Sequence, residues 1–108
     1  MTQSTYNSEL STAEVDGTLV VHGDLDLYEA TQFRAEAEDY VRRTDEPRFD
    51  MRDVPFLDSA GLATLLYLSR QASAHHKTLR VLISGGPRRV LKITGIDRLI
   101  VVDDSDDV

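Results

Sequence analysis

The residues best suited to chemistry lie in one short segment, positions 53–62 (DVPFLDSAGL). Asp58 and Ser59 precede a long apolar stretch, and either side chain can cap a helix by accepting a hydrogen bond from a backbone N–H group of its first turn. Pro55 favours an extended chain before the cap, so the serine is presented at a defined point. Helix capping and a functional serine are both open interpretations of this segment.

A serine at the start of a helix can accept a phosphoryl group without unfolding of the protein. Free backbone N–H groups and the positive end of the helix dipole accommodate negative charge at that place. Phosphorylation adds about −1.5 to −2 charges at pH 7, which changes the surface while the fold is kept. Ser59 is therefore a candidate for a switch that a partner protein reads.

A nucleophilic role is another interpretation of Ser59. Such a serine needs a base within hydrogen-bond reach and an oxyanion hole, and the segment lacks the Gly-x-Ser-x-Gly turn of a hydrolase. The available bases are His22, near an expected strand end, and the adjacent pair His75 and His76, whose side chains point to different helix faces. We therefore expect no enzyme and no catalytic residue.

A cluster of carboxylates is a third interpretation, because four aspartates fall near expected strand ends. They are Asp24, Asp26, Asp53 and Asp58. Carboxylates so placed could hold magnesium, as in a phosphoryl-aspartate receiver. Exposed acidic loops are commoner, and the late lysine that a receiver needs, Lys92, falls in an expected helix. The turn at 85–87 lacks the spacing of a phosphate-binding loop, so we expect neither metal nor cofactor.

The elements that must position Ser59 alternate between strands and helices. Strands are expected at about 10–15, 18–22, 48–54, 79–83 and 99–102, and helices at 28–43, at 59–75 and from 85–87 to a stop at Gly95. This order, β-β-α-β-α-β-α-β, predicts an α/β fold with a mixed, mostly parallel sheet and helices packed on it. Loops at the carboxyl ends of strands carry the chemistry of such sheets, and residues 23–26 and 56–59 lie there.

Length and charge limit the classes of function. The 108 residues suffice for one core, and we expect a domain at 8–102, a polar N-terminus at 1–7 and an acidic tail at 103–108. Absence of cysteine excludes disulfides and thiolate chemistry. Without a signal peptide or an apolar run of about 20 residues, a cytoplasmic protein is expected. The net charge of −7 disfavours nucleic acid and anionic membranes as partners.

One basic cluster departs from this negative charge. Arg88, Arg89, Lys92 and Arg98 lie in one short stretch of an expected helix and its end. A solvated helix face is one interpretation, since runs of charge are commonly exposed. A docking patch for a partner is the other, and the sequence leaves both open.

Three segments together resemble a known family. Residues 23–26 (GDLD), Asp53 with residues 56–62 (FLDSAGL) and residues 88–97 (RRVLKITGID) look like the anti-sigma factor antagonists, or anti-anti-sigma factors, of bacteria. These proteins are built on the STAS domain. The resemblance spans nearly the whole chain in the family's order and spacing, and it implies a single STAS-like domain.

The resemblance implies a partner switch at Ser59, the serine directly after the aspartate of the family's Asp-Ser-x-Gly-Leu motif. The unphosphorylated form would bind an anti-sigma factor serine kinase and free a sigma factor. Phosphorylation by that kinase would switch binding off, and a metal-dependent serine phosphatase would reset the cycle. The implied partner-binding residues are Gly23, Asp24, Asp26, Phe56, Leu57, Asp58, Ser59, Ala60 and Gly61.

A different use of the same fold stays open. The chain could be a STAS scaffold or an accessory subunit of a larger signalling or lipid-transport complex, without a phosphorylation switch. Because Ala60 follows the serine, Ser59 is the only hydroxyl in the motif, so the candidate phosphorylation site is unambiguous. Purification of the native complex and identification of its largest partner would separate the two possibilities.

Overall fold

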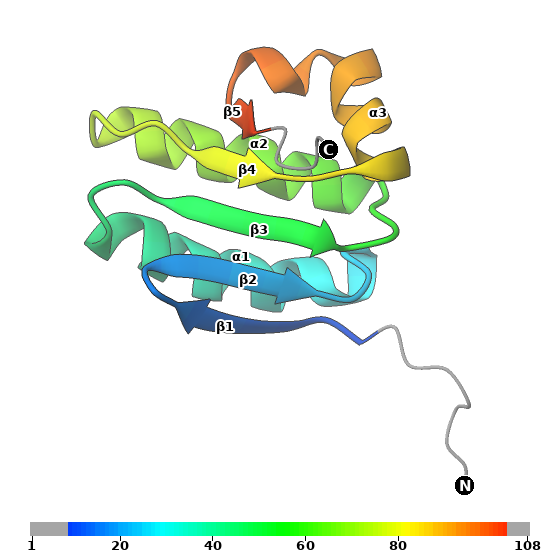
Figure 1. Ribbon diagram of the computed structural model, residues 1–108, viewed down its shortest axis with the longest axis horizontal. Coiled ribbons are helices and arrows are strands. Elements are labelled where there is room, and N and C mark those ends of the chain that lie inside the picture. Colours follow the sequence, from blue (N-terminus) through cyan, green and yellow to red (C-terminus); the bar gives the residue numbers. More distant parts are fainter. Residues whose placement is uncertain (1–8, 104–108) are drawn as a thin grey trace, which may run out of the picture.

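A five-stranded sheet in the order β1-β2-β3-β4-β5 is the centre of the fold (Figure 1). The structure is a computed structural model that describes residues 9–103. Strand β1 pairs antiparallel with β2, and β2, β3, β4 and β5 pair in parallel. The mixed, mostly parallel sheet expected from the sequence is confirmed. The strands are β1 (Ser11–Val15), β2 (Thr18–His22), β3 (Arg48–Asp53), β4 (Arg80–Leu82) and β5 (Val101–Asp103).

Helices cover one face of this sheet. Helices α1 (Leu27–Arg43) and α2 (Ser59–Ala74) lie side by side behind the strands in Figure 1, and α3 (Gly85–Thr94) follows β4. A short 3-10 helix, η1 (Ile96–Arg98), joins α3 to β5. No helix within residues 9–103 has the length and apolar character needed to cross a bilayer.

Aromatic side chains fill the layer between α1 and the sheet. The rings of Phe33 and Phe49 meet edge to face with their centroids 5.8 Å apart. The hydroxyl of buried Tyr40 donates to the carbonyl of Gly17 at 2.6 Å and accepts from the backbone N–H of Arg48 at 3.0 Å. One side chain thereby joins the β1–β2 hairpin, α1 and the start of β3, because all three contribute to its contacts.

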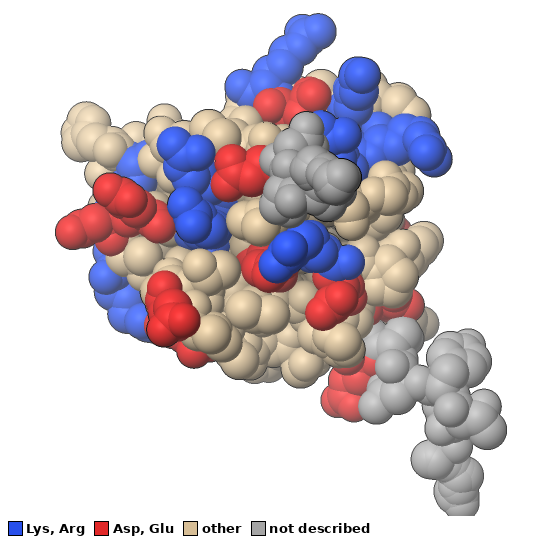
Figure 2. Space-filling model, viewed as in Figure 1, with Lys and Arg blue, Asp and Glu red and all other residues tan. Residues whose placement is uncertain are grey.

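The face of the sheet turned away from α1 and α2 carries charged side chains on β3. Phe49 and Met51 of β3 point into the core, while Asp50 and Arg52 alternate with them on the other side. The Arg52 guanidinium donates to both Asp50 oxygens, at 2.9 and 2.7 Å, and holds the pKa of that carboxyl below its usual range. In the space-filling view, side chains of both signs are interspersed over this face (Figure 2).

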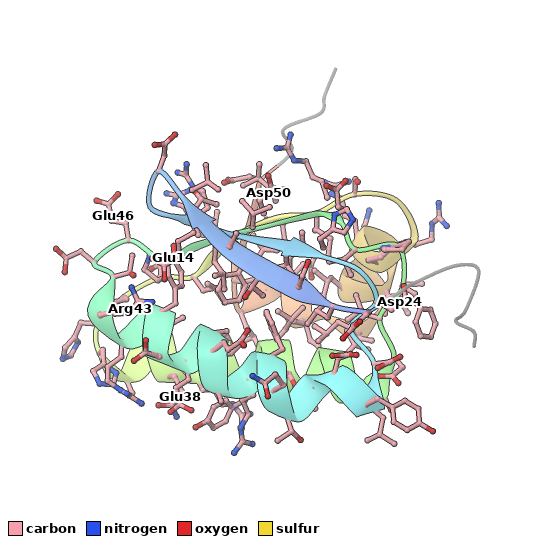
Figure 3. All side chains as sticks on the ribbon, turned by 90° about the horizontal axis from the view of Figure 1, so that it is seen from below. Glu14, Asp24, Glu38, Arg43, Glu46 and Asp50 are labelled. Carbon is pink, nitrogen blue, oxygen red and sulfur yellow. The ribbon has the colours of Figure 1, made fainter. Side chains whose placement is uncertain are left out.

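Ionic contacts fix β1 to α1. The Arg43 guanidinium of α1 donates to both carboxylate oxygens of Glu14 on β1, and its Nε donates to Asp39 at 2.8 Å (Figure 3). Arg43 lowers the pKa of Glu14 and of Asp39 from their ordinary values through these hydrogen bonds. The otherwise polar edge strand is thereby held against the helix layer.

The last strand begins later than the sequence predicts. The apolar run at 99–102 suggested a strand, but Leu99 ends the 3-10 turn, with its N–H bonded to the Ile96 carbonyl at 2.9 Å. Gly95, at φ +83°, ends α3 and turns the chain so that Ile96 and Ile100 enter the core. Pairing with β4 therefore starts at Val101 and includes Asp103, which was expected in the acidic tail. The expected N-terminus at 1–7 and residues 104–108 of that tail lie outside the described residues.

Candidate functional site

The two segments singled out in the sequence meet at the carboxyl ends of β2 and β3. The N–H of Leu25 donates to the Phe56 carbonyl at 3.0 Å, and the N–H of Asp58 donates to the Leu25 carbonyl at 3.3 Å. Leu25 and Leu57 form a parallel bridge between these contacts. Residues 23–26 and 56–59 therefore form one hydrogen-bonded junction, from which both α1 and α2 start.

Two aspartates hold the helix N-termini at this junction. Asp26 caps α1 by accepting from the N–H groups of Tyr28 and Glu29, at 3.1 and 3.2 Å. Asp58 Oδ1 accepts from the N–H groups of Ala60 and Gly61, at 2.9 and 3.0 Å. These charge-assisted bonds satisfy donors that helix ends leave free.

Asp58 also bridges the two helices. Its second oxygen, Oδ2, accepts from the N–H of Leu27, the first residue of α1, at 3.0 Å. One carboxylate thus binds the N-termini of α1 and α2 together. Since both oxygens of Asp58 and the Oδ1 of Asp26 are used in this way, the two acids have a structural task at the junction.

Gly61 is required by the close approach of these segments. A Cβ at this position would lie 2.5 Å from the Leu25 carbonyl oxygen, a distance that side chains essentially never show. Gly23 is constrained similarly, with φ +105° and a would-be Cβ 2.5 Å from the Glu9 carbonyl oxygen. Both glycines belong to the predicted partner-binding set, and both are buried, so their contribution is to the shape of the junction.

Ser59 is the first residue of α2, and its side chain is exposed. Because Asp58 rather than Ser59 caps the helix, the serine hydroxyl is not used in capping. Among residues 9–103 no hydrogen bond of this hydroxyl is recorded. The oxygen therefore lies beside the positive end of a helix and is accessible to solvent.

Exposed apolar side chains occur on both segments of the junction. Phe56 is 51% exposed, and Leu27 and Tyr28 of the first turn of α1 are 68% and 89% exposed. Leu57 of the predicted set is buried instead and anchors the loop. Leu27 and Tyr28 were not predicted. Tyr28 does not fall on the apolar stripe of α1 but on the opposite, polar face of the helix. This position could have indicated an exposed aromatic residue.

A groove extends this apolar surface towards α3. It has a volume of about 270 Å³ and runs between the loop that carries Phe56 and the helix face that carries Ile93, which is 76% exposed. Its lining residues are Pro55, Phe56, Leu57, Gly86, Pro87, Arg89, Val90 and Ile93. Exposed large apolar residues in continuous arrangement are typical of protein interaction sites.

The histidines named by the enzyme interpretation make other contacts. His22 pairs with Asp53 across the ends of β2 and β3, with 3.4 Å between Nδ1 and Oδ2. His75 lies at the other end of α2, where its Nδ1 is 3.0 Å from the Gln71 carbonyl. In the described part of the chain, no three acidic or histidine side chains come together as a possible metal site.

Comparison with solved structures shows the same fold in regulatory proteins and in a transporter family. An anti-sigma factor antagonist from Mycobacterium paratuberculosis is 23% identical, with a TM-score of 0.75 over 92% of this chain and 87% of that one. SpoIIAA from Bacillus in its phosphorylated form is 19% identical, with a TM-score of 0.66 over 92% and 95%. Unphosphorylated SpoIIAA, an anti-sigma factor antagonist, is 21% identical, with a TM-score of 0.61 over 84% and 97%.

A sulfate transporter family protein from Wolinella succinogenes is also similar. It is 17% identical, with a TM-score of 0.70 over 88% of this chain and 83% of that one. At these identities the solved structures establish the fold. The family model described as "Mlab, STAS domain" matches residues 8–102, nearly the whole chain. The chain therefore belongs to the STAS domain family, as its three motifs indicated.

Proposed function

We propose that this STAS domain is a bacterial anti-sigma factor antagonist that acts in the cytoplasm and is switched by phosphorylation of Ser59. Its unphosphorylated form binds an anti-sigma factor serine kinase, and a serine phosphatase restores that form. The observation that carries the proposal is the exposed Ser59 hydroxyl at the start of α2, beside exposed Phe56, Leu27 and Tyr28. Kinase chemistry, with ATP and magnesium, belongs to the partner.

The expected size of the switch follows from burial of Ser59 in the interface. Leaving a phosphate buried without a partner costs roughly 3–5 kcal/mol, by analogy with a broken buried ion pair. Because about 1.4 kcal/mol is a factor of ten in affinity, binding should weaken on the order of a hundred- to several-thousand-fold. The carboxylates of Asp26 and Asp58 add repulsion to any acidic group of the partner. No large conformational change is required.

Phosphorylation is tested with purified candidate anti-sigma kinases and ATP, followed by mass mapping of the modified residue. We expect one phosphate at Ser59 in the wild-type protein and none in Ser59→Ala. Ser73→Ala is the matched control, because Ser73 is exposed at the opposite end of the same helix. Modification of the Ser59→Ala protein at another residue would contradict the proposal.

Binding is tested with the kinase that phosphorylates the protein, by calorimetry with Ser59→Ala and Ser59→Asp. Ser59→Ala should bind like the unphosphorylated protein, and Ser59→Asp should bind more weakly. Ser73→Asp places the same charge on α2 away from the junction and should bind normally. Equal affinities of Ser59→Ala and Ser59→Asp would rule out the switch.

A second candidate, an accessory subunit without a switch, is favoured by two of the similarities. The matching family model is named for Mlab, and one similar structure is a sulfate transporter family protein. The same apolar surface around Phe56 would then bind a permanent partner. A native complex whose assembly tolerates Ser59→Asp but not Phe56→Ala would support this candidate over the antagonist.

A further inference from the structure

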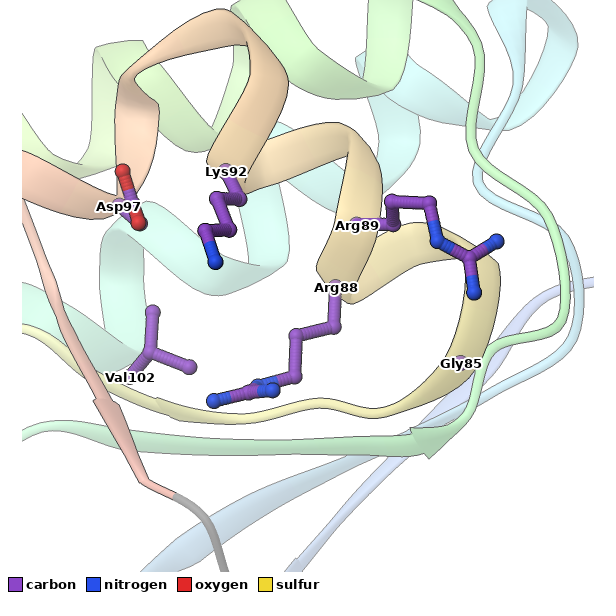
Figure 4. Close-up of a pocket in the computed structure, with 6 residues that line it drawn as sticks. All are labelled: Gly85, Arg88, Arg89, Lys92, Asp97 and Val102. Carbon is purple, nitrogen blue, oxygen red and sulfur yellow. The ribbon is translucent and has the colours of Figure 1, made fainter.

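The basic cluster of α3 forms one wall of a pocket of about 530 Å³. Its lining residues are Gly85, Arg88, Arg89, Lys92, Asp97 and Val102. Figure 4 shows Arg88 and Lys92 extending from α3 on the side of Val102 in β5, with Arg89 on the side of the helix start. Arg88 and Lys92 thus extend on the side of Asp97 and Val102, whereas Arg89 points away from Asp97 (Figure 4). The lining contains three cations and one carboxylate in a chain whose net charge is −7, an arrangement that favours anions.

Strand β5 ends at the same edge of the sheet as β4. Strands β4 and β5 are parallel, with Leu82 opposite Asp103. After Leu82 the chain reaches the pocket residue Gly85 within three positions, so the chain that follows Asp103 starts at the same edge of the sheet. Asp103 is itself 3.5 Å from Arg80 through Oδ1 and Nη1, and its neighbour Val102 lines the pocket.

The residues that follow are suited to this site by charge and length. Residues 103–107 read Asp-Asp-Ser-Asp-Asp. Fully extended, the four residues after Asp103 reach about 13–14 Å, enough to pass along the α3 wall of the pocket. Exposed ion pairs are individually weak. Stable binding therefore needs several ion pairs at the same time. A segment with consecutive carboxylates can form several such pairs.

We propose that the basic pocket of α3 is a binding site for an acidic peptide segment, and that its occupant is the chain's own residues 104–107. The carboxylates of this segment pair with the guanidinium and ammonium groups of Arg88, Arg89 and Lys92. While the segment is bound, the positive charge of α3 is hidden from other anions. Inorganic phosphate and a second acidic peptide are competitors for the same groups.

The first test compares backbone amide shifts of the full chain, by 1H–15N NMR, with those of the full-length variant Asp104→Asn, Asp106→Asn, Asp107→Asn. We expect shift differences concentrated at 85–92 and 102, which disappear in 0.5 M salt because exposed pairs are screened. The control variant Asp45→Asn, Glu46→Gln removes charge from an exposed loop far from the pocket and should leave these amides unchanged. Shifts that are absent, or equal in the control, overturn the proposal.

The second test adds an acetylated peptide of residues 103–108 to the neutralised full-length variant. A short tether gives an effective concentration on the order of millimolar, so the segment is bound within the chain only if the peptide's Kd is about 1 mM or lower. Lys92→Gln should raise the Kd of the peptide by about 1.5- to 5-fold. A peptide that does not bind, or inorganic phosphate that binds equally to the wild-type and neutralised chains, shows that the segment does not cover the pocket.

Discussion

Asp58 and Ser59 are neighbours with separate tasks. Asp58 binds the N-termini of both α1 and α2, and this leaves the Ser59 hydroxyl exposed and outside the capping network. A serine that capped the helix itself would lose that bond on phosphorylation. Because the cap and the serine are separate residues, the proposed phosphate at Ser59 would leave the capping bonds of Asp58 in place.

At the same junction, Gly61→Ala should destabilise the protein by roughly 1–3 kcal/mol, the cost of forcing extra atoms into a packed site. The added methyl group would lie 2.5 Å from the backbone oxygen of Leu25, which cannot move without breaking its bond to Asp58. Urea denaturation measures the loss. Gly86→Ala is the matched control, because nothing lies within 4 Å of a Cβ there and alanine favours helix. Equal stability of the two variants would contradict this packing.

Among the elements, the β1–β2 hairpin depends on α1 for its attachment. Tyr40 bonds the turn at Gly17 and the start of β3 at Arg48, and Arg43 bonds Glu14 of β1. Edge strands with an unpaired side are prone to detach or to pair with other chains. These two side chains of one helix hold the edge strand in register.

Tyr40→Phe should cost about 1–3 kcal/mol of unfolding free energy, at about 0.5–1.5 kcal/mol for each of two hydrogen bonds. The substitution removes the hydroxyl of a buried side chain, which bonds the Gly17 carbonyl and the Arg48 N–H. Thermal and urea unfolding followed by circular dichroism measure the change. Tyr28→Phe removes a hydroxyl that is exposed on the same helix and should stay within about 0.5 kcal/mol of wild type. A similar loss of unfolding free energy in both variants would show that the hydrogen bonds of the Tyr40 hydroxyl do not stabilise the fold.

Arg43→Ala should lower stability at pH 7 and have a smaller effect at pH 3. Arg43 lowers the pKa values of Glu14 and Asp39, so their contribution is present above the ordinary values of 4.5 and 3.8. It is lost as the pH falls through the lower pKa values of the folded state. Urea midpoints of the two proteins should therefore converge on acidification. Arg70→Ala, on α2, is the control. Its urea midpoint should differ from that of the wild type by the same amount at pH 7 and at pH 3.

Across the whole molecule, positive and negative charge are placed unequally. The chain is acidic overall, and the basic side chains of α3 line one pocket while aspartates gather at the start of α1 and α2. The surface around Ser59 is apolar and carries carboxylates, so one added phosphate changes it greatly.

The fold should therefore survive negative charge at Ser59. Ser59→Asp is expected to lie within about 1 kcal/mol of wild type in unfolding free energy, because the helix N-terminus favours an anion. Ser73→Asp puts the same charge near the last turn of α2, where the dipole is unfavourable, and should be no more stable than Ser59→Asp. Urea unfolding curves of the two variants measure both free energies of unfolding. A collapse of Ser59→Asp alone would mean that the site cannot act as a reversible switch.

The element order and the family were predictable from the sequence, and the last strand was not. Local periodicity identified α1 and α2, and the Asp-Gly turn identified the first hairpin, because these signals depend on neighbours in the chain. The strand expected at 99–102 begins at Val101, because Ile96 and Ile100 are drawn into the core by the turn at Gly95. A continuous apolar run does not reveal such a turn.

By itself the sequence determined the α/β class, the position of Ser59 at a helix start and the presence of a basic cluster, since each follows from residue type and short-range spacing. Only the tertiary structure decided that Asp58 rather than Ser59 caps α2, that Asp58 also holds α1, and that Leu27 and Tyr28 lie exposed beside the serine. It also brought α3 and β5 together around one pocket. Those facts depend on contacts between segments distant along the chain, and no local pattern of residues encodes their geometry.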